Sequence, residues 1–129
     1  MKHNSDFRYD LELGKSVENE LSKILTDKKI EVKMDKIAHR TGNIAIEYEC
    51  RGKPSGIAVT EAEYYAYVIP MAPLRNIILL MEVEYLKRLS RLHFLEGRIK
   101  KMGDSNLSNA VLIPINDLFI HHEKKQDGD

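Results

Sequence analysis

KIEVKMDKIAHRTGNIAIEYEC, residues 29–50, alternates apolar with polar side chains on both sides of a Thr-Gly-Asn break. Alternation rich in β-branched residues is typical of strands with one buried face, and a Gly-containing break between two such runs is typical of a hairpin. The sequence therefore predicts two strands joined by a turn. On the second strand, Glu47 and Glu49 fall on one face, while Ile46 and Tyr48 occupy the other. Buried carboxylates are costly to desolvate unless a cation or hydrogen bonds compensate, so this pair of acids requires partners.

The length of the predicted turn determines whether Asp35 faces Glu47. A two-residue loop at residues 42–43 puts Asp35 and Glu47 on opposite faces of the hairpin. A three-residue loop at residues 40–42 pairs Asp35 directly with Glu47 and puts Gly42 where a left-handed backbone is needed. Both registers are compatible with the sequence.

In the second register, Asp35, Glu47 and Glu49 form a cluster whose mutual repulsion requires a cation. Oxygen ligands select hard divalent ions. Mg²⁺, with Mn²⁺ as a substitute, takes one or two carboxylates, keeps several waters and adds phosphate oxygens. A metal held in this way activates an attacking water and stabilises charge on a phosphoryl centre. The alternative is a half-exposed sheet face that carries ordinary surface acids.

Further helices and strands are predicted around this hairpin. Residues 14–25 place apolar side chains at helical spacing and predict a helix. Residues 55–59, SGIAV, predict a third strand. Thr60 and Glu63 have the spacing of a capping box, which predicts a short helix that gives way to a fourth strand at residues 66–69.

The second half of the chain continues with one long helix and more strand-like runs. NIILLM, residues 76–81, fits either a strand or the buried start of a helix, and NAVLIPI, residues 109–115, predicts a strand. Residues 82–99 predict a helix, because its apolar side chains recur on one face. These are Leu86, Leu89, Leu92 and Ile99.

The composition fits one soluble domain at residues 1–120, followed by a disordered tail at residues 121–129. Of the 129 residues, 43% are hydrophobic and 31% charged, and no apolar run approaches the roughly 20 residues that cross a bilayer. The N-terminus lacks the apolar core of a signal peptide, and one cysteine, Cys50, fits a reducing compartment. We therefore expect a cytoplasmic protein with no membrane partner. In the tail, His121 and His122 either bind a metal or belong to a solvated terminus.

The formal net charge is zero, which gives no indication of a polyanionic partner. The second predicted helix and its continuation nevertheless concentrate basic residues. This basic segment is either a solvated helix face or a nucleic-acid-binding patch. Its members are Lys87, Arg88, Arg91, Arg98, Lys100 and Lys101.

The order of acids and elements resembles the PD-(D/E)XK nuclease superfamily, in particular its small phage-type and Holliday-junction-resolvase-like members. That family has an acid on one strand, an acid-x-lysine or acid-x-acid on the next, and a preceding helix with a glutamate. Asp35, Glu47-Tyr48-Glu49 and Glu18 match these places, and the similarity covers residues 10–119. The resemblance implies a single-domain, restriction-endonuclease-like α/β core of order α-β-β-β-α-β, with a central mixed sheet flanked by helices.

The resemblance also implies roles for these residues. Asp35 and Glu47 would bind Mg²⁺ together with the Tyr48 carbonyl. Glu18, or Glu20 if the helix phase differs by half a turn, would contribute directly or through water. Glu49 would position a water or a second ion.

This chain departs from the family at Glu49, where most members have lysine. The role of that lysine is either vacant or taken by another residue. Lys53 is the nearest candidate in the sequence and Lys36 the next, although either can be an ordinary surface lysine. Ser55 and Thr60 are candidates for contacts to the DNA backbone, while for Thr60 helix capping is a sufficient explanation.

The function that the resemblance implies is hydrolysis of DNA phosphodiester bonds by a metal-activated water. The expected protein is an endonuclease of phage or mobile-element origin that acts in a bacterial host cytoplasm, and a homodimer is compatible with symmetric DNA substrates. Two alternatives remain open. One is a catalytically inactive nuclease fold used for binding or inhibition, and the other is an unrelated α+β ligand-binding domain.

Overall fold

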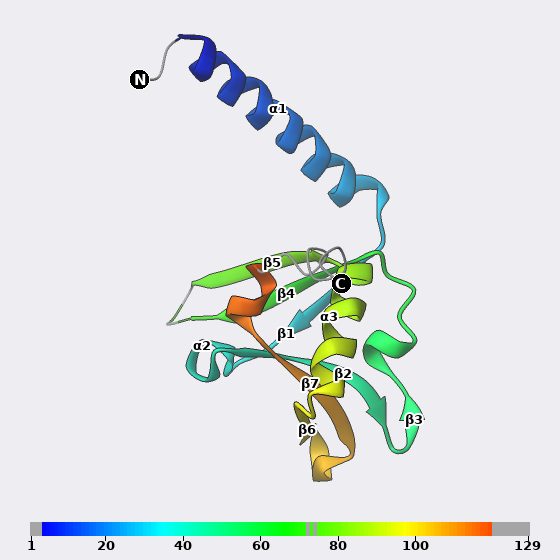
Figure 1. The fold of residues 1–129 in the computed structure, drawn as a ribbon. Coiled ribbons are helices and arrows are strands. Elements are labelled where there is room, and N and C mark those ends of the chain that lie inside the picture. Colours follow the sequence, from blue (N-terminus) through cyan, green and yellow to red (C-terminus); the bar gives the residue numbers. More distant parts are fainter. Residues whose placement is uncertain (1–3, 72, 74, 120–129) are drawn as a thin grey trace, which may run out of the picture.

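Two β-sheets and a set of helices make up this α/β protein (Figure 1). The computed structural model describes residues 4–71, 73 and 75–119. A mixed sheet contains β1 (Ile30–Met34), β4 (Tyr64–Pro70) and β5 (Asn76–Glu82), with β1 parallel and β5 antiparallel to the central β4. An antiparallel sheet of order β3-β2-β7-β6 contains β2 (Asn43–Cys50), β3 (Lys53–Pro54), β6 (Ile99–Met102) and β7 (Ser108–Pro114).

Three α-helices and three 3₁₀ turns accompany the described strands. The α-helices are α1 (Asn4–Asp27), α2 (Ala38–Thr41) and α3 (Val83–Leu95), and the 3₁₀ turns are η1 (Gly56–Ala58), η2 (Asp104–Asn106) and η3 (Ile115–Phe119). Figure 1 shows α3 beside the antiparallel sheet, whereas α1 extends away from the body of the molecule. None of the described helices is long and apolar enough to span a membrane.

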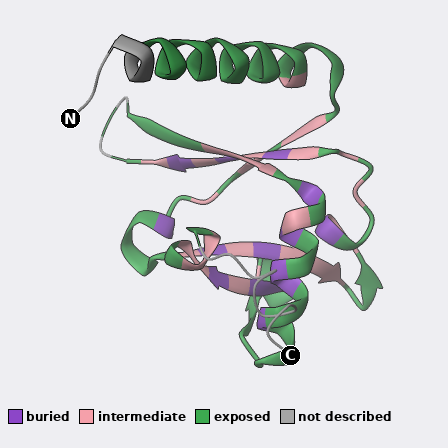
Figure 2. Ribbon diagram, turned by 45° about the horizontal axis from the view of Figure 1, so that its top comes forward, coloured by how far each residue is buried: buried purple, intermediate pink, exposed green. Residues whose placement is uncertain are grey.

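The hydrophobic core lies between the two sheets and α3 (Figure 2). Alternation in β4 buries Tyr65, Tyr67 and Ile69, because every second side chain of a strand faces the same way. From β2 and β7, Ile44 pairs with Ile113 on the same core. Each fully buried side chain of this kind contributes about 1.5–3 kcal/mol. The further core residues are Ala38, Ile46, Ile57, Val83, Leu86, Leu89 and Val111.

The predicted hairpin at residues 29–50 is wrong. Both of its strands form, but β1 pairs with β4 and β2 pairs with β7 and β3, with α2 between β1 and β2. Gly42 is left-handed as expected, with φ of 74°, yet it ends α2, where its N–H donates to the Ala38 carbonyl. Neither predicted loop length therefore applies.

The predicted helix after Thr60 is also wrong. The Thr60 hydroxyl accepts a hydrogen bond from the Ala62 N–H and donates one of 2.7 Å to the Glu31 carboxylate. Glu63 is engaged with Lys29, whose N–H donates to its carboxylate, so the reciprocal bonds of a capping box are not made. The predicted strand at residues 66–69 is confirmed within β4.

The 3₁₀ turn η1, Gly56–Ala58, lies where the sequence predicts a third strand at residues 55–59. Gly56 has a φ of 51°, outside the strand region, and its backbone lies against the Glu47 carbonyl. The short β3 precedes this turn, so the Gly-Lys-Pro segment itself pairs with β2.

The remaining elements are largely confirmed. The helix predicted at residues 14–25 lies within α1, residues 76–81 lie in β5, and residues 109–114 lie in β7. The second predicted helix ends at Leu95, and Ile99 begins β6 instead. The tail at residues 121–129, with His121 and His122, lies outside the described residues.

Candidate functional site

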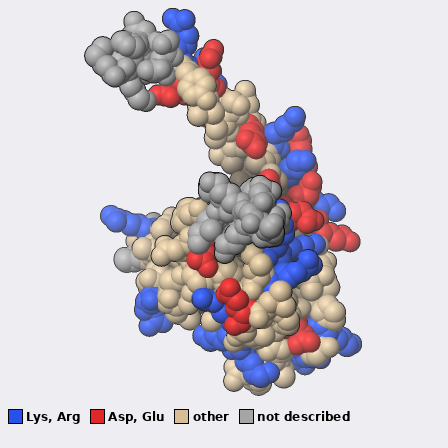
Figure 3. Space-filling view, in the orientation of Figure 1, with Lys and Arg blue, Asp and Glu red and all other residues tan. Residues whose placement is uncertain are grey.

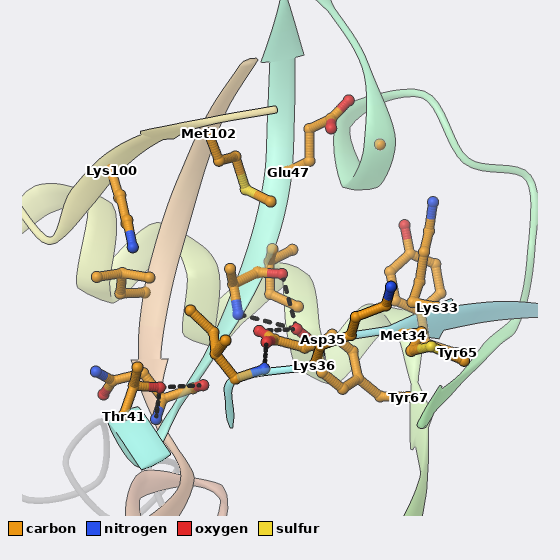
Figure 4. A pocket seen from close by; sticks show the side chains of 16 residues that line it. Lys33, Met34, Asp35, Lys36, Thr41, Glu47, Tyr65, Tyr67, Lys100 and Met102 are labelled. Carbon is orange, nitrogen blue, oxygen red and sulfur yellow. Dashed lines mark hydrogen bonds between the residues drawn. The ribbon is translucent and has the colours of Figure 1, made fainter. Parts of the chain in front are cut away.

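A pocket of about 500 Å³ lies where the two sheets face each other (Figure 4). It is lined from both sheets and from the α2 and η1 segments, so residues far apart in the sequence meet in it. Charged and polar side chains dominate part of its wall, and apolar side chains form the rest. The lining residues are Lys33, Met34, Asp35, Lys36, Ile37, Thr41, Asn43, Ala45, Ile46, Glu47, Gly56, Tyr65, Tyr67, Lys100, Met102 and Leu112.

Asp35 directly follows β1 and is half-buried in this pocket. One carboxylate oxygen accepts the Ile37 N–H at 2.9 Å, which is an Asx turn that leads the chain into α2. The other accepts the Tyr67 hydroxyl at 2.9 Å. That hydroxyl also accepts the Ala45 N–H at 3.0 Å and thereby ties Asp35 to β2. Because both oxygens have protein partners, the orientation of the carboxylate is fixed before any ligand arrives.

Glu47 lies in β2 and is also half-buried. Its carboxylate accepts a hydrogen bond of 2.8 Å from the Ser55 hydroxyl. The close approach of Gly56 to the Glu47 carbonyl brings Ser55 within this reach. Figure 4 shows the Glu47 side chain directed toward the η1 segment, while Asp35 points toward Tyr67. The two carboxylates thus belong to one pocket without contacting each other directly.

Lys33, Lys36 and Lys100 add positive charge to the same pocket. The Lys33 ammonium forms a 2.7 Å ion pair with Glu31 and lies 5.7 Å from the centre of the Tyr65 ring. In the part of the chain that the structure describes, the side chains of Lys36 and Lys100 form no ion pair or hydrogen bond. These two ammonium groups are therefore available to an anionic ligand.

Two buried tyrosines form the floor of the pocket. Burial raises the pKa of Tyr65 to about 12, and the nearby Glu31 and Glu47 carboxylates act in the same direction. Burial also raises the pKa of Tyr67 well above its usual value, reinforced by the charge of Asp35. The Tyr65 hydroxyl is buried and has no hydrogen-bond partner among the described residues. Both hydroxyls stay protonated at neutral pH; the Tyr67 hydroxyl donates to Asp35, and the Tyr65 hydroxyl keeps a proton that a ligand could accept.

Asp35 and Glu47 are the predicted acids that the structure brings together, and Glu49 is separate from them. The pairing of β2 with β7 shifts between Glu47 and Glu49, which is a β-bulge at Tyr48. A bulge interrupts the alternation of side chains, so Glu47 and Glu49 need not share a face. The Glu49 carboxylate accepts a 2.6 Å hydrogen bond from Asn109 and does not line the pocket.

Other predicted site residues lie elsewhere. The Tyr48 carbonyl accepts the Ser55 N–H at 3.0 Å, and its ring packs edge-on against Phe94. Lys53 is exposed in β3 and is not among the lining residues, whereas Lys36 is. Glu18 is exposed on α1, as is Glu20.

Ser55 and Thr60 are the residues predicted to contact the DNA backbone. In the structure the Ser55 hydroxyl donates a hydrogen bond to the Glu47 carboxylate, and the Thr60 hydroxyl donates one to the Glu31 carboxylate. Lys33 was missed although it stands two residues before Asp35 and therefore shares its strand face. Lys100 belongs to the basic segment of the sequence. No local sequence pattern indicates that it lines the same pocket as Asp35.

The basic segment spans α3 and the start of β6, with Lys100 and Lys101 in β6. Lys87, Arg88 and Arg91 lie on α3, while Arg98 pairs with Glu96 at 3.2 Å. Figure 3 shows basic and acidic side chains interspersed over the visible face.

The donor chemistry of the pocket suits a hard cation only in part. Within the described ranges, no three His, Cys, Asp or Glu side chains gather closely enough to hold a metal ion, so the predicted cluster of Asp35, Glu47 and Glu49 is not formed. Asp35 and Glu47 remain as the two carboxylates of the pocket, and each is held by protein hydrogen-bond partners.

Comparisons of the chain with protein-family models, with curated proteins and with solved structures found no match. The fold and the site define an α/β protein with a charged pocket between two sheets. Its function has to be inferred from that pocket.

Proposed function

We propose that the protein is a Mg²⁺-dependent nuclease that hydrolyses DNA phosphodiester bonds. One observation carries the proposal: Asp35 and Glu47, which come from different sheets, line a single pocket together with three lysines. Carboxylates that hold a metal and ammonium groups that hold phosphate are the two components that phosphodiester hydrolysis requires. The resemblance to PD-(D/E)XK nucleases names the same two acids, and we propose that the two sheets are a variant of that core.

Each residue has a role that follows from its contacts. Asp35 and Glu47 would hold Mg²⁺, or Mn²⁺ in its place, and the ion would activate a water and neutralise developing charge on the phosphate. Tyr67 and Ser55 orient the two carboxylates through hydrogen bonds of 2.9 and 2.8 Å. Lys36 and Lys100 would bind phosphate oxygens. We place the role of the missing family lysine on Lys100 rather than on Lys53, because Lys100 lines the pocket.

The proposal includes DNA as the partner and a host cytoplasm, with phage or mobile-element origin, as the setting. These parts rest on the resemblance alone. An exchange of Mg²⁺ for Mn²⁺ should preserve activity, since both are hard cations that accept oxygen ligands.

A binding protein without catalysis is the second candidate. Both carboxylates already have hydrogen-bond partners in the chain, and Glu49 occupies the place of the family lysine. In that case the pocket would hold a phosphate-bearing ligand through its lysines and tyrosines, without a metal.

Cleavage of labelled single-stranded, duplex, flapped and four-way DNA, with Mg²⁺ or Mn²⁺ and with chelator, tests the proposal. Asp35→Asn and Glu47→Gln should each reduce cleavage at least a hundredfold. Glu49→Gln makes the same chemical change outside the pocket and should keep cleavage within about threefold, because its partner is Asn109. No cleavage of any substrate by the wild type, with DNA binding retained, would establish the binding protein instead.

A further inference from the structure

The outer face of the mixed sheet is apolar, and no other segment among the described residues covers it. Opposite residues of neighbouring strands share a face, and the registers β1–β4 and β4–β5 give two cross-strand rows on the side away from the pocket. One row contains Val32, Ala66 and Leu80, and the other contains Val68 and Ile78 together with Met34, which also borders the pocket. Val32 and Ile78 are 67% and 61% exposed. A contiguous apolar face of this kind marks an interaction surface.

Helix α1 has an apolar stripe that is equally uncovered. Its members recur every four residues, the spacing that places side chains on one helix face. They are Leu13, Val17, Leu21 and Leu25, each between 44% and 61% exposed. Figures 1 and 2 show α1 apart from the body except near its C-terminal end, and Figure 3 shows uncharged side chains along it. Helical stability comes mainly from packing an apolar face, and within the described residues this stripe packs against no other element.

The connection to β1 is short and anchored. Only two residues, Lys28 and Lys29, separate α1 from β1. The Lys29 N–H donates to the Glu63 carboxylate at 3.2 Å, and its carbonyl accepts the Glu63 and Tyr64 N–H groups at 2.9 and 3.1 Å. Lys28 adds a 3.5 Å ion pair with Glu63. These contacts anchor the end of α1 at the sheet, and in the structure α1 extends from the body and leaves the outer face of its own chain exposed.

The dimensions of the two surfaces match. A 24-residue helix is about 36 Å long, while a seven-residue strand spans about 23 Å. The helix can therefore cross the whole sheet of a neighbouring molecule. If two copies related by a twofold axis each placed α1 on the mixed sheet of the other, both apolar stripes and both outer faces would be covered. The interface would then be closed and self-complementary.

We propose that the protein is a homodimer in which α1 of each copy lies across the outer face of β1, β4 and β5 of the other. The pocket opens on the opposite side of this sheet, where Lys33 and Tyr65 project, so the exchange leaves both pockets accessible. The inference does not depend on the nuclease activity, and cleavage-deficient Asp35→Asn protein should dimerise equally.

Mixed cysteine variants test the exchange directly. In a Cys50→Ser background, one tagged chain carries Leu13→Cys, Val17→Cys or Leu21→Cys, and a second, untagged chain carries Ile78→Cys. After mixing under reducing conditions and oxidation, we expect disulfide-linked pairs of one tagged and one untagged chain. A single chain that carries both an α1 cysteine and Ile78→Cys tests the alternative, in which α1 packs on the sheet of its own chain. An intrachain link with a monomeric mass by light scattering would overturn the proposal, as would the absence of a mixed link at all three positions.

Charge substitutions provide the second readout. Val17→Glu on the apolar stripe and Ile78→Glu on the sheet should each raise the dimer dissociation constant at least tenfold, because each buries a carboxylate in an apolar contact. Asn19→Glu adds the same charge to the opposite face of α1 and should leave the dimer unchanged. Sedimentation equilibrium at several concentrations measures the three constants. Equal dissociation constants for all three variants would contradict the arrangement.

Discussion

Gly56 has less room for a side chain than any other glycine that the structure describes. A Cβ atom at this position would lie 2.2 Å from the Glu47 carbonyl oxygen, and the φ of 51° is unfavourable for side chains. The contact is with backbone, which cannot rotate away. The orientation of Glu47 in the pocket thus depends on the absence of one methyl group.

We expect Gly56→Ala to lower the free energy of unfolding by more than about 2 kcal/mol, from strain plus overpacking. Urea denaturation measures the loss. Gly52→Ala is the matched control, since Gly52 has a φ of 79° but a Cβ added there would meet no atom within 4 Å. Its cost should stay near the conformational strain of about 1–2 kcal/mol. An equal loss in both variants would show that the close approach to Glu47 is unimportant.

Tyr65 allows a prediction about pH. Its pKa rises from 10.0 to about 12 in the folded protein, mainly through burial. The unfolded chain therefore releases this proton first as the pH rises, and the free energy of unfolding falls between about pH 10 and 12. Tyr65→Phe should show a smaller fall over this range in urea denaturation. Tyr9→Phe, on exposed α1, should reproduce the wild-type slope.

The sequence predicts which segments form strands, because their side chains alternate, but it does not predict which strands pair with each other. Alternation correctly indicated strands at β1, β2, β4 and β7, because burial on one face leaves a local pattern. The hairpin failed because β1 finds its partner in β4, more than 30 residues away, and no local residue records that choice. The capping box failed because Thr60 bonds to Glu31, a contact that exists only after β1 and β4 have met.

Two side-chain contacts link η3 to α3: the pair of His93 with Asp117, and the hydrogen bond of 3.1 Å that the Tyr85 hydroxyl donates to the Leu118 carbonyl. Nε2 of His93 lies 2.7 Å from the Asp117 carboxylate, and Nδ1 lies 3.0 Å from the Leu89 carbonyl. Asp117→Ala would leave a buried ring nitrogen without its acceptor, which costs about 1–3 kcal/mol. Thermal unfolding should detect this loss, whereas Asp104→Ala in exposed η2 should have a much smaller effect. A melting temperature unchanged by Asp117→Ala would mean that water replaces the carboxylate.

In the molecule as a whole, the pocket exists only when both sheets are in place. The sequence singled out Asp35 and Glu47, which both line the pocket, since acids within strand patterns stand out locally. It could not exclude Glu49, because a bulge at Tyr48 has no marker in the residues themselves. It also missed the position of Lys100, which reaches the pocket through the pairing of β6 with β7.

A comparison of substitutions at Lys100 and Lys101, two neighbouring lysines, tests whether the assembled pocket binds phosphate. Lys100 lines the pocket beside residues of the other sheet, while the Lys101 ammonium lies 3.5 Å from Asn109, outside the lining. If Lys100 binds phosphate, Lys100→Ala should weaken binding of a short DNA duplex about tenfold and reduce the salt-dependence slope by about 1. Lys101→Ala removes the same charge and should change the affinity less than about threefold. Fluorescence anisotropy with Ca²⁺ in place of Mg²⁺, at several salt concentrations, measures both. Equal losses would indicate a diffuse electrostatic effect, in which case Lys100 has no specific role in the pocket.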